Sequence, residues 1–309
     1  MFKGVDHIGV GVDDVAAGKR FYGDLGFTSV VFEYRGELPG LERLTGRRGA
    51  EAEVVMLRTE QPGPLGLGLI KLVRSLDVDP PPMPEGLAWG EIGVCEVCVH
   101  ARGQDNVFRH LVEERGHTPL MEPLVVDLPP YDTTADLSYV ADPWGGKVEL
   151  LEWSDLCKGW PSGQPRVEGV NHVAFGVSDM DRSREFYARL GFTELMFDYD
   201  GYFDPMAPWY TGEPPKQRIV MLTNPYGAGI EPVQHFPSST DMRGEWGHLG
   251  PMDFAVGVTN LGKAYESLRM EGVEFVSEPQ TVDVGTGEWQ YAYVLDPDGN
   301  YVSLVEARY

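Results

Sequence analysis

The chain has 309 residues, of which 42% are hydrophobic, and a formal net charge of −23. That length is enough for two domains of about 150 residues, each with its own core. A surface this acidic repels phosphate backbones, so we expect no nucleic-acid partner. We recognise neither a run of about 18 apolar residues nor a signal-peptide pattern, and therefore expect a cytoplasmic protein without a membrane partner.

The cysteines fit a reducing compartment. There are three of them, Cys95, Cys98 and Cys157, which suggests no disulfide framework. Cys95 and Cys98 have C-x-x-C spacing, but alternation along a strand predicts that they point to opposite faces. We therefore do not interpret this pair as a zinc or redox motif.

The beginning of the chain predicts a strand followed by a helix, and the same pattern returns in the second half. The segment "VDHIGVGVDDVAAGKRFY" (5–22) matches "VNHVAFGVSDMDRSREFY" (170–187) at a shift of 165 residues, which indicates an internal duplication. An aspartate stands where each helix should begin and could accept hydrogen bonds from its free N–H groups. The candidates for these caps are Asp13 or Asp14 in the first copy and Asp179 or Asp181 in the second.

Weaker copies of this pattern follow within each half. Strands at 96–101 and 253–258 each lead into a helix, and later hairpins turn at an Asp-Pro-x-Gly sequence. We predict an α+β fold built from four βαβββ modules, at roughly 3–76, 90–153, 167–237 and 249–309.

The modules also suggest a division into domains. We predict an N-terminal domain at 1–153 and a C-terminal domain at 170–309. The stretch 154–169 between them is rich in Pro, Gly and polar residues, as linkers are.

The first strands of the two duplicated segments have one face that carries small residues. In "HVAFGV", Val173 and Phe175 point to one side, whereas His172 leads the other side and is followed by alanine and glycine. A soluble core would normally fill such a face with bulk, so we infer an open concave surface. At the equivalent position, the modules carry the ligand-type residues His7, Glu96, His172 and Asp253.

The last strand of each module gives a second set of candidates. These residues are Lys71, Glu149, Glu231 and Ser303. Apolar neighbours flank Glu149 and Glu231, which predicts that both point inward. A buried carboxylate is costly unless it is paired or bound to a metal.

The modules and the segments "VDHIGVGV", "VNHVAFGV" and "DPWGGKVEL" resemble the vicinal oxygen chelate superfamily. That group includes glyoxalase I, extradiol dioxygenases, methylmalonyl-CoA epimerase and the bleomycin resistance proteins. The resemblance implies two cupped mixed β-sheets with helices outside, and one divalent metal ion held by first and last strands. Its identity (Fe, Mn, Zn, Ni, Co or Mg) is left open.

The resemblance implies different ligand sets for different pairings of the modules. If neighbours pair, one site holds His7, Glu96 and Glu149, and the other holds His172, Glu231 and Asp253. If the inner modules pair, a complete set forms from Glu96, Glu149, His172 and Glu231, whereas the outer modules keep a degenerate site with Lys71 and Ser303. We favour the inner pairing because Lys71 and Ser303, the two residues that depart from the ligand pattern, then fall in one site. A chain that binds no metal remains an alternative.

The ligand types favour one reaction over its rivals. Carboxylates with one imidazole resemble glyoxalase I and the epimerases, where the metal holds two adjacent oxygens of a small substrate and a glutamate moves a proton between carbons. This implies a lyase or isomerase in which Glu149 or Glu231 is catalytic. One alternative is a ring-cleaving dioxygenase of a catechol or hydroquinone. The other is an antibiotic-binding resistance protein without catalysis.

Aromatic loops are the candidates for a substrate-binding wall. The first, 198–218, carries Tyr202, Trp209 and Tyr210. The second, 239–250, carries Trp246 and His248. Tyr131 lies in a third such loop, and the chain is expected to be a monomer or a homodimer.

Overall fold

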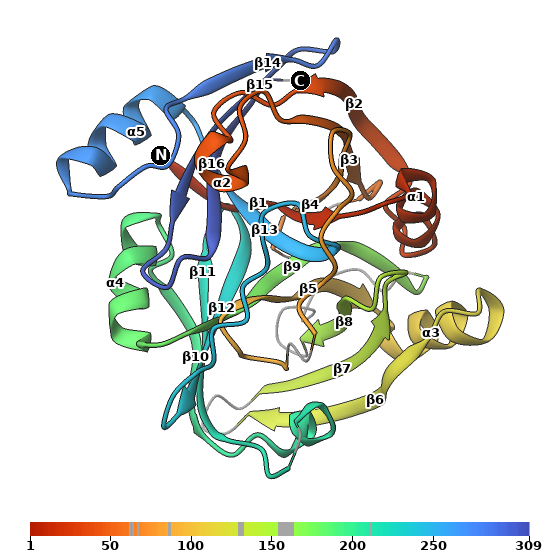
Figure 1. The fold of residues 1–309 in the computed structure, drawn as a ribbon. Coiled ribbons are helices and arrows are strands. Elements are labelled where there is room, and N and C mark those ends of the chain that lie inside the picture. The colour runs from red at the N-terminus through yellow and green to blue at the C-terminus, as the bar shows by residue number, and fades with distance from the viewer. Residues whose placement is uncertain are drawn as a thin grey trace.

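The computed structural model describes residues 1–61, 63, 65–66, 68–85, 88–128, 133–153, 164–210 and 212–308. In this part of the chain, the strands join into one mixed sheet, and the helix that follows the first strand of each module lies outside it (Figure 1). The α+β fold with repeated strand–helix–strand modules is therefore confirmed.

Each module contributes one long helix segment and a set of strands. The first contains β1 (Phe2–Gly11), α1 (Val15–Asp24), β2 (Ser29–Glu37), α2 (Glu42–Thr45), β3 (Glu51–Arg58) and β4 (Leu69–Ser75). The second contains β5 (Gly93–Arg102), α3 (Gln104–Arg109), the π-helical η1 (His110–Glu114), β6 (Pro119–Leu128), β7 (Thr133–Ala141) and β8 (Lys147–Trp153). The third contains β9 (Arg166–Val177), α4 (Met180–Arg189), β10 (Glu194–Gly201), the 3₁₀ segment η2 (Asp204–Trp209), β11 (Lys216–Asn224) and β12 (Gly227–Phe236). The fourth contains β13 (Gly250–Val258), α5 (Leu261–Met270), β14 (Gln280–Asp283), β15 (Glu288–Leu295) and β16 (Tyr301–Arg308).

The helices of the duplicated segments begin at an aspartate, as predicted. The Asp14 carboxylate accepts hydrogen bonds from the N–H groups of Ala16 and Ala17 at the start of α1. The Asp179 carboxylate accepts one from Arg182 at the start of α4. These bonds satisfy donors that the first turn of a helix leaves free.

The last strand of every module runs parallel to its first strand. The register between the two strands is the same in all four modules at the predicted ligand positions. In each case the last-strand residue lies opposite the residue two places after the first-strand candidate. The aligned pairs are Gly9 with Lys71, Cys98 with Glu149, Ala174 with Glu231, and Ala255 with Ser303. Because side chains alternate along a strand, each first-strand candidate lies on the same face as its last-strand partner.

The antiparallel contacts between first strands decide which modules share a concave face. β5 pairs with β9, so that Cys98 lies opposite His172, and β1 pairs with β13, so that His7 lies opposite Ala255. We call modules two and three the inner cup, and modules one and four the outer cup. This is the pairing that the sequence favoured, and each cup takes one module from each half of the chain.

The two cups are continuous with one another. β1 also pairs with β12, which joins the outer cup to the inner cup in one sheet (Figure 1). On the helix side, Phe175 of β9 stacks on Phe254 of β13 with ring centroids 5.2 Å apart. The main hydrophobic core therefore runs beneath both cups and ties them together.

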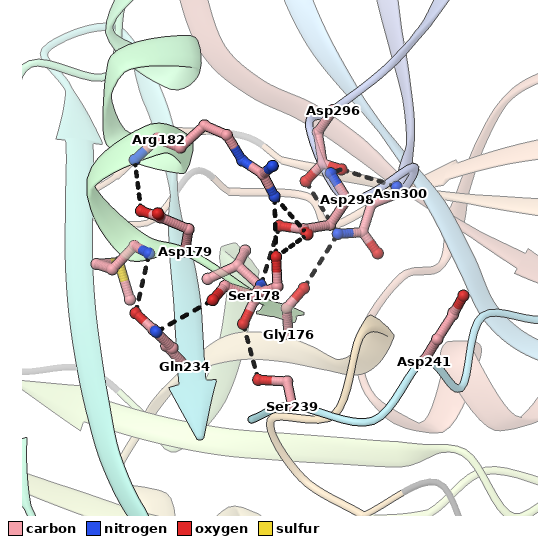
Figure 2. Close-up of polar contacts among 12 residues, drawn as sticks. Gly176, Ser178, Asp179, Arg182, Gln234, Ser239, Asp241, Asp296, Asp298 and Asn300 are labelled. Carbon is pink, nitrogen blue, oxygen red and sulfur yellow. Dashed lines mark hydrogen bonds and ion pairs between the residues drawn. The ribbon is translucent and has the colours of Figure 1, made fainter. Parts of the chain in front are cut away.

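Polar contacts also connect the end of β9 to the fourth module. Figure 2 shows Ser178, directly after β9, and Arg182 of α4 around the Asp298 carboxylate in the β15–β16 turn. Asn300 of the same turn donates to the Gly176 carbonyl at 3.1 Å. Because β9 carries His172, these bonds hold the strand of a candidate ligand against the outer cup.

Part of the predicted linker can be placed. Residues 154–163 lie outside the described part of the chain, as does Tyr131, whereas residues 166–169 already belong to β9. Among the described residues, the helices are too short or too polar to span a membrane.

Candidate metal centre

Four predicted ligands converge in the inner cup. The Nε2 atom of His172 lies 3.5 Å from Glu96 Oε1, 3.6 Å from Glu149 Oε2 and 3.5 Å from Glu231 Oε2. The four residues come from β5, β8, β9 and β12, two strands of each module. The structure thus brings together residues that are up to 135 positions apart in the sequence (231 − 96 = 135).

These side chains are almost completely buried. Glu96 and His172 are 0% and 1% exposed, and Glu149 and Glu231 are 4% and 7% exposed. No described residue forms a hydrogen bond with Glu96 Oε1, Glu149 Oε2 or His172 Nε2. Buried polar atoms are rarely left without a partner, so three that face one another are suited to hold a cation.

The protonation of the cluster reflects the cost of burying charge. Burial, followed by the nearby Glu96 carboxylate, raises the pKa of Glu149 to about 8. Burial likewise raises the pKa of Glu231. Burial acts to lower the pKa of His172, but Glu231, Glu96 and Glu149 more than offset it and raise the value to about 10. Without a cation from outside, the cluster therefore retains protons to limit its negative charge.

Neighbouring groups orient two of the candidate ligands. Nδ1 of His172 lies 2.9 Å from the Asn171 side-chain oxygen, and donation there leaves Nε2 directed at the cluster. The indole N–H of Trp89 donates to Glu96 Oε2 at 2.8 Å, so the other carboxylate oxygen faces His172. Such supporting contacts are typical of metal ligands.

Sequence reasoning missed Cys98, which lies beside this cluster. Its Sγ is within 4.8 Å of ligand atoms of Glu149 and His172. The prediction that Cys95 and Cys98 point to opposite faces was wrong, because both pack in the hydrophobic cluster of the inner cup. The register of β5 on β9 shifts between Val94 and Glu96, and this bulge breaks the alternation on which the prediction relied. A bulge has no reliable signal in the sequence.

A small cavity opens beside the candidate ligands. Glu149, His172 and Glu231 lie at its polar end, and the remainder of its wall is aliphatic or aromatic. The aromatic side chains are Trp89, Tyr139, Trp153, Phe197, Tyr199 and Phe203. The cavity volume of about 40 Å³ accommodates only a few water molecules, so a substrate would enter after part of the wall has moved.

The predicted substrate-binding residues of the first aromatic loop lie near this cavity but do not line it. Tyr202 is 63% exposed, whereas the Trp209 ring packs on Tyr139 with centroids 4.4 Å apart. The Tyr210 hydroxyl donates to the Trp89 carbonyl at 2.6 Å. The loop instead contributes Phe203 and other neighbours to the wall.

The other predicted residues lie in the outer cup, away from the cavity. Trp246 belongs to the hydrophobic cluster there, and His248 is buried with its Nδ1 atom 2.8 Å from the Leu249 carbonyl. His7 is 0% exposed, and its Nδ1 lies 2.9 Å from an oxygen of Asp6. The physical reason is the pairing of modules one and four, which separates these residues from the inner cup.

The outer cup has a cation of its own at the equivalent place. The Lys71 ammonium lies 2.9 Å from Asp253 Oδ2, which also accepts hydrogen bonds from Tyr293 and Trp246. Burial acts to raise the pKa of Asp253, but Lys71 and Tyr293 hold it below its ordinary value. The ammonium already supplies the positive charge that a metal would bring, so the donors of the inner cup fit a divalent cation and those of the outer cup do not.

Comparison with known proteins agrees with this geometry. The model of the Glyoxalase/Bleomycin resistance protein/Dioxygenase superfamily matches residues 169–304. Glyoxalase I from Zea mays has a TM-score of 0.63 at 15% identity, covering 98% of this chain and 92% of that one. A putative dioxygenase from Bacillus subtilis subsp. subtilis str. 168 has a TM-score of 0.55 at 12% identity, covering 99% and 85%. No curated protein matches the sequence.

The chain therefore has the fold of the vicinal oxygen chelate proteins, in a form with two cups. The model of the glyoxalase, bleomycin resistance and dioxygenase superfamily matches the second half of the chain, and the resemblance stated from the sequence is confirmed.

Proposed function

We propose that this protein is an enzyme that binds one divalent metal ion in the inner cup. The ligands would be Glu96, Glu149, His172 and Glu231. The observation that carries this proposal is the convergence of three carboxylates on Nε2 of His172 at 3.5–3.6 Å, with buried atoms that lack partners among the described residues. An oxygen-rich set with one imidazole suits Mn²⁺, Fe²⁺, Co²⁺, Ni²⁺, Zn²⁺ or Mg²⁺.

The three glutamates differ in what they can do beyond binding the ion. Glu96 does not line the cavity and is fixed by Trp89, so it acts as a ligand alone. Glu149 and Glu231 both reach the cavity. Either carboxylate could move a proton at a bound substrate, and we assign this role first to Glu149.

The reaction that this arrangement supports is proton transfer between adjacent carbons. When bound, the metal would polarise two neighbouring substrate oxygens and stabilise negative charge on them. Glu149 would take the proton of a C–H bond beside a carbonyl group while the electron pair of that bond shifts toward the carbonyl oxygen. Return of the proton to the same carbon would give epimerase chemistry. In a hydroxyketone, its return to the former carbonyl carbon, with the hydroxyl proton passing to the former carbonyl oxygen as the second carbonyl forms, would give isomerase chemistry of the glyoxalase kind.

The cavity wall indicates the kind of substrate. Apart from the glutamates and His172, the described lining residues are apolar or aromatic, and none of them is Lys or Arg. A long anionic tail would find no countercharge there, whereas a compact apolar or aromatic body would bury its surface. We therefore infer a small neutral substrate with two adjacent oxygens at one end.

The aromatic wall also supports a second candidate, a ring-cleaving dioxygenase of a catechol or hydroquinone. A planar diol would suit a wall that contains Trp89, Tyr139 and Trp153. The inner cup offers only His172 as an imidazole at the described cluster, whereas non-haem iron oxygenases typically use two histidines and one carboxylate. Proton transfer is for this reason the first candidate.

The test begins with the metal content of the purified chain and continues with exchange of a carbon-bound proton. Protein loaded with Mn²⁺ or Co²⁺ is incubated in D₂O with 2-hydroxyacetophenone, an aromatic hydroxyketone, and deuterium incorporation is followed by NMR. Glu149→Gln should reduce exchange by roughly 10²–10⁴-fold. Glu231→Gln is the matched variant because it removes the other carboxylate that faces the cavity.

The possible results separate the candidates. Equal metal content in both variants with exchange lost only in Glu149→Gln supports Glu149 as the base, and the reverse pattern assigns that role to Glu231. Oxygen uptake with catechol by the Fe²⁺ or Mn²⁺ protein would favour the dioxygenase. A chain that takes up no metal would overturn the proposal and favour a binding protein.

A further inference from the structure

A sequence repeat precedes the first strand of the second module in each half. "WGEIGVCE" (89–96) and "WGHLGPMD" (246–253) share a tryptophan, two glycines and a final acidic residue at identical spacing. The glycine after each tryptophan has a positive φ, +83° at Gly90 and +93° at Gly247, which favours glycine there. Both segments therefore turn in the same way before the chain enters its strand.

The turn brings each tryptophan back to the acidic residue that ends the repeat. The indole N–H of Trp89 donates to Glu96 at 2.8 Å, and that of Trp246 donates to Asp253 at 3.1 Å. Both indoles are buried, with exposed fractions of 1% and 6%. A hydrogen bond to a buried carboxylate is strong and directional, so each tryptophan fixes the orientation of its acid.

The two acids differ in the group that lies beside them. Oδ2 of Asp253 accepts hydrogen bonds from Lys71 and Tyr293 as well as Trp246, while its Oδ1 has no hydrogen-bond partner among the described residues. Oε2 of Glu96 accepts the hydrogen bond from Trp89. Oε1 of Glu96 has no hydrogen-bond partner among the described residues and lies 3.5 Å from His172 Nε2. In the inner cup, the indole therefore occupies one carboxylate oxygen and leaves the other for the cluster.

Contacts with the first aromatic loop, 198–218, hold Trp89 in place. Its carbonyl accepts the Tyr210 hydroxyl at 2.6 Å, and Tyr210 also lies 3.2 Å from Nε2 of His235. The Phe203 ring lies 6.3 Å from the Trp89 ring. The indole is thus clamped between this loop and Glu96.

We propose that Trp89 is a positioning residue that presents a single oxygen of Glu96 to the metal of the inner cup. This role rests on the proposed function, because it requires that Glu96 binds a metal ion. Trp89 holds no ligand atom itself and acts through the carboxylate. Trp246 makes the same bond in the outer cup, where Lys71 replaces the ion, and therefore has no influence on metal binding.

Two substitutions test this role, with the repeat providing its own control. Trp89→Phe removes the indole donor beside the cluster, and Trp246→Phe removes the equivalent donor in the outer cup. Co²⁺ affinity is measured by competition with a chelator, and the visible spectrum of bound Co²⁺ reports its ligand geometry. We expect Trp89→Phe to weaken Co²⁺ binding by about 10–100-fold and to change the spectrum, whereas Trp246→Phe leaves both at wild-type values.

A second variant separates loss of the donor from loss of packing. Replacing Trp89 with 3-benzothienylalanine keeps the shape of the ring system but substitutes sulfur for the N–H group. Weaker Co²⁺ binding in this variant, with apo-protein stability near wild type, supports the positioning role even if Trp89→Phe does not fold. Unchanged affinity and spectrum in the folded variants would overturn the role of Trp89 while leaving the metal site intact. If the wild-type chain binds no Co²⁺, the proposed function fails, and this role fails with it.

Discussion

Lys71 lies 2.9 Å from Asp253 in the outer cup, at the strand position that Glu149 takes in the inner cup. Lys71 and Asp253 are both 0% exposed. The ammonium also lies within 6.0 Å of the Trp289 and Tyr293 ring centroids. One cup thus contains a lysine ammonium as its internal cation, whereas the acidic groups of the other surround His172.

Removal of the outer cation should destabilise the fold. Lys71→Met leaves the Asp253 carboxylate buried without an opposite charge, and we expect a loss of about 3–5 kcal/mol in the free energy of unfolding, measured with urea. Adding Asp253→Asn should recover part of that loss, because an amide oxygen can still accept from Trp246. Lys19→Met removes an exposed pair with Glu33 and serves as the control, with an effect below about 1 kcal/mol. Equal stability of the Lys71 and Lys19 variants would contradict this account.

The two histidines of the duplicated strands should differ in their effect on metal binding. His172→Gln removes the ligand at the centre of the inner cluster, and we expect Mn²⁺ affinity to fall by more than about 100-fold. His7→Gln makes the same change in the outer cup and should leave both affinity and stoichiometry unaltered. Isothermal titration gives both quantities. Two ions per wild-type chain, with one lost in each variant, would show that the outer cup also binds metal.

Asp142 should make stability depend on pH near 6. Burial raises the pKa of this carboxyl to about 6, although the N–H groups of Gly146 and Trp144 donate to one of its oxygens. A raised pKa means that the folded state keeps the proton longer than the unfolded state. The stabilisation is therefore present at low pH and is lost as the pH rises through about 6, by on the order of 2–3 kcal/mol.

The substitution Asp142→Asn removes this titration and keeps the accepting oxygen. Relative to wild type, the variant should gain free energy of unfolding between pH 4.5 and pH 8, as followed by urea unfolding across that range. Asp127→Asn, at an exposed position on β6, is the control and should show no such trend. Parallel stability curves for wild type and Asp142→Asn would refute the prediction.

Cys98 should influence which metal is preferred. Its sulfur lies within 4.8 Å of ligand atoms of Glu149 and His172, and thiolate is a softer donor than carboxylate. We expect Cys98→Ser to lower Zn²⁺ affinity while Mn²⁺ affinity stays near wild type, as measured by chelator competition. Cys95→Ser, three residues earlier on the same strand, is the matched control. Equal effects on both metals would rule out a direct role for the sulfur.

Much of the fold and of the candidate site could be predicted from the sequence. Local signals are enough to predict a strand followed by a helix that Asp14 or Asp179 caps. Repetition of those signals along the chain reveals the modules. The register of β8 on β5 and of β12 on β9 then places Glu149 and Glu231 on the faces that alternation predicted. Two features escaped prediction: the bulge that turns Cys95 and Cys98 to one side, and the loop placement that put Trp246 in the outer cup.

The sequence by itself determined which residues occupy equivalent positions, because alternation and capping act over a few residues along the chain. Only the tertiary structure decided which modules share a concave face, since that depends on long-range pairing of β5 with β9 and of β1 with β13. The same pairing brings Glu96 to His172 and Lys71 to Asp253. One cup consequently gathers three carboxylates around a single imidazole and the other pairs its carboxylate with an ammonium, for the physical reason that a buried charge is stable only beside its opposite.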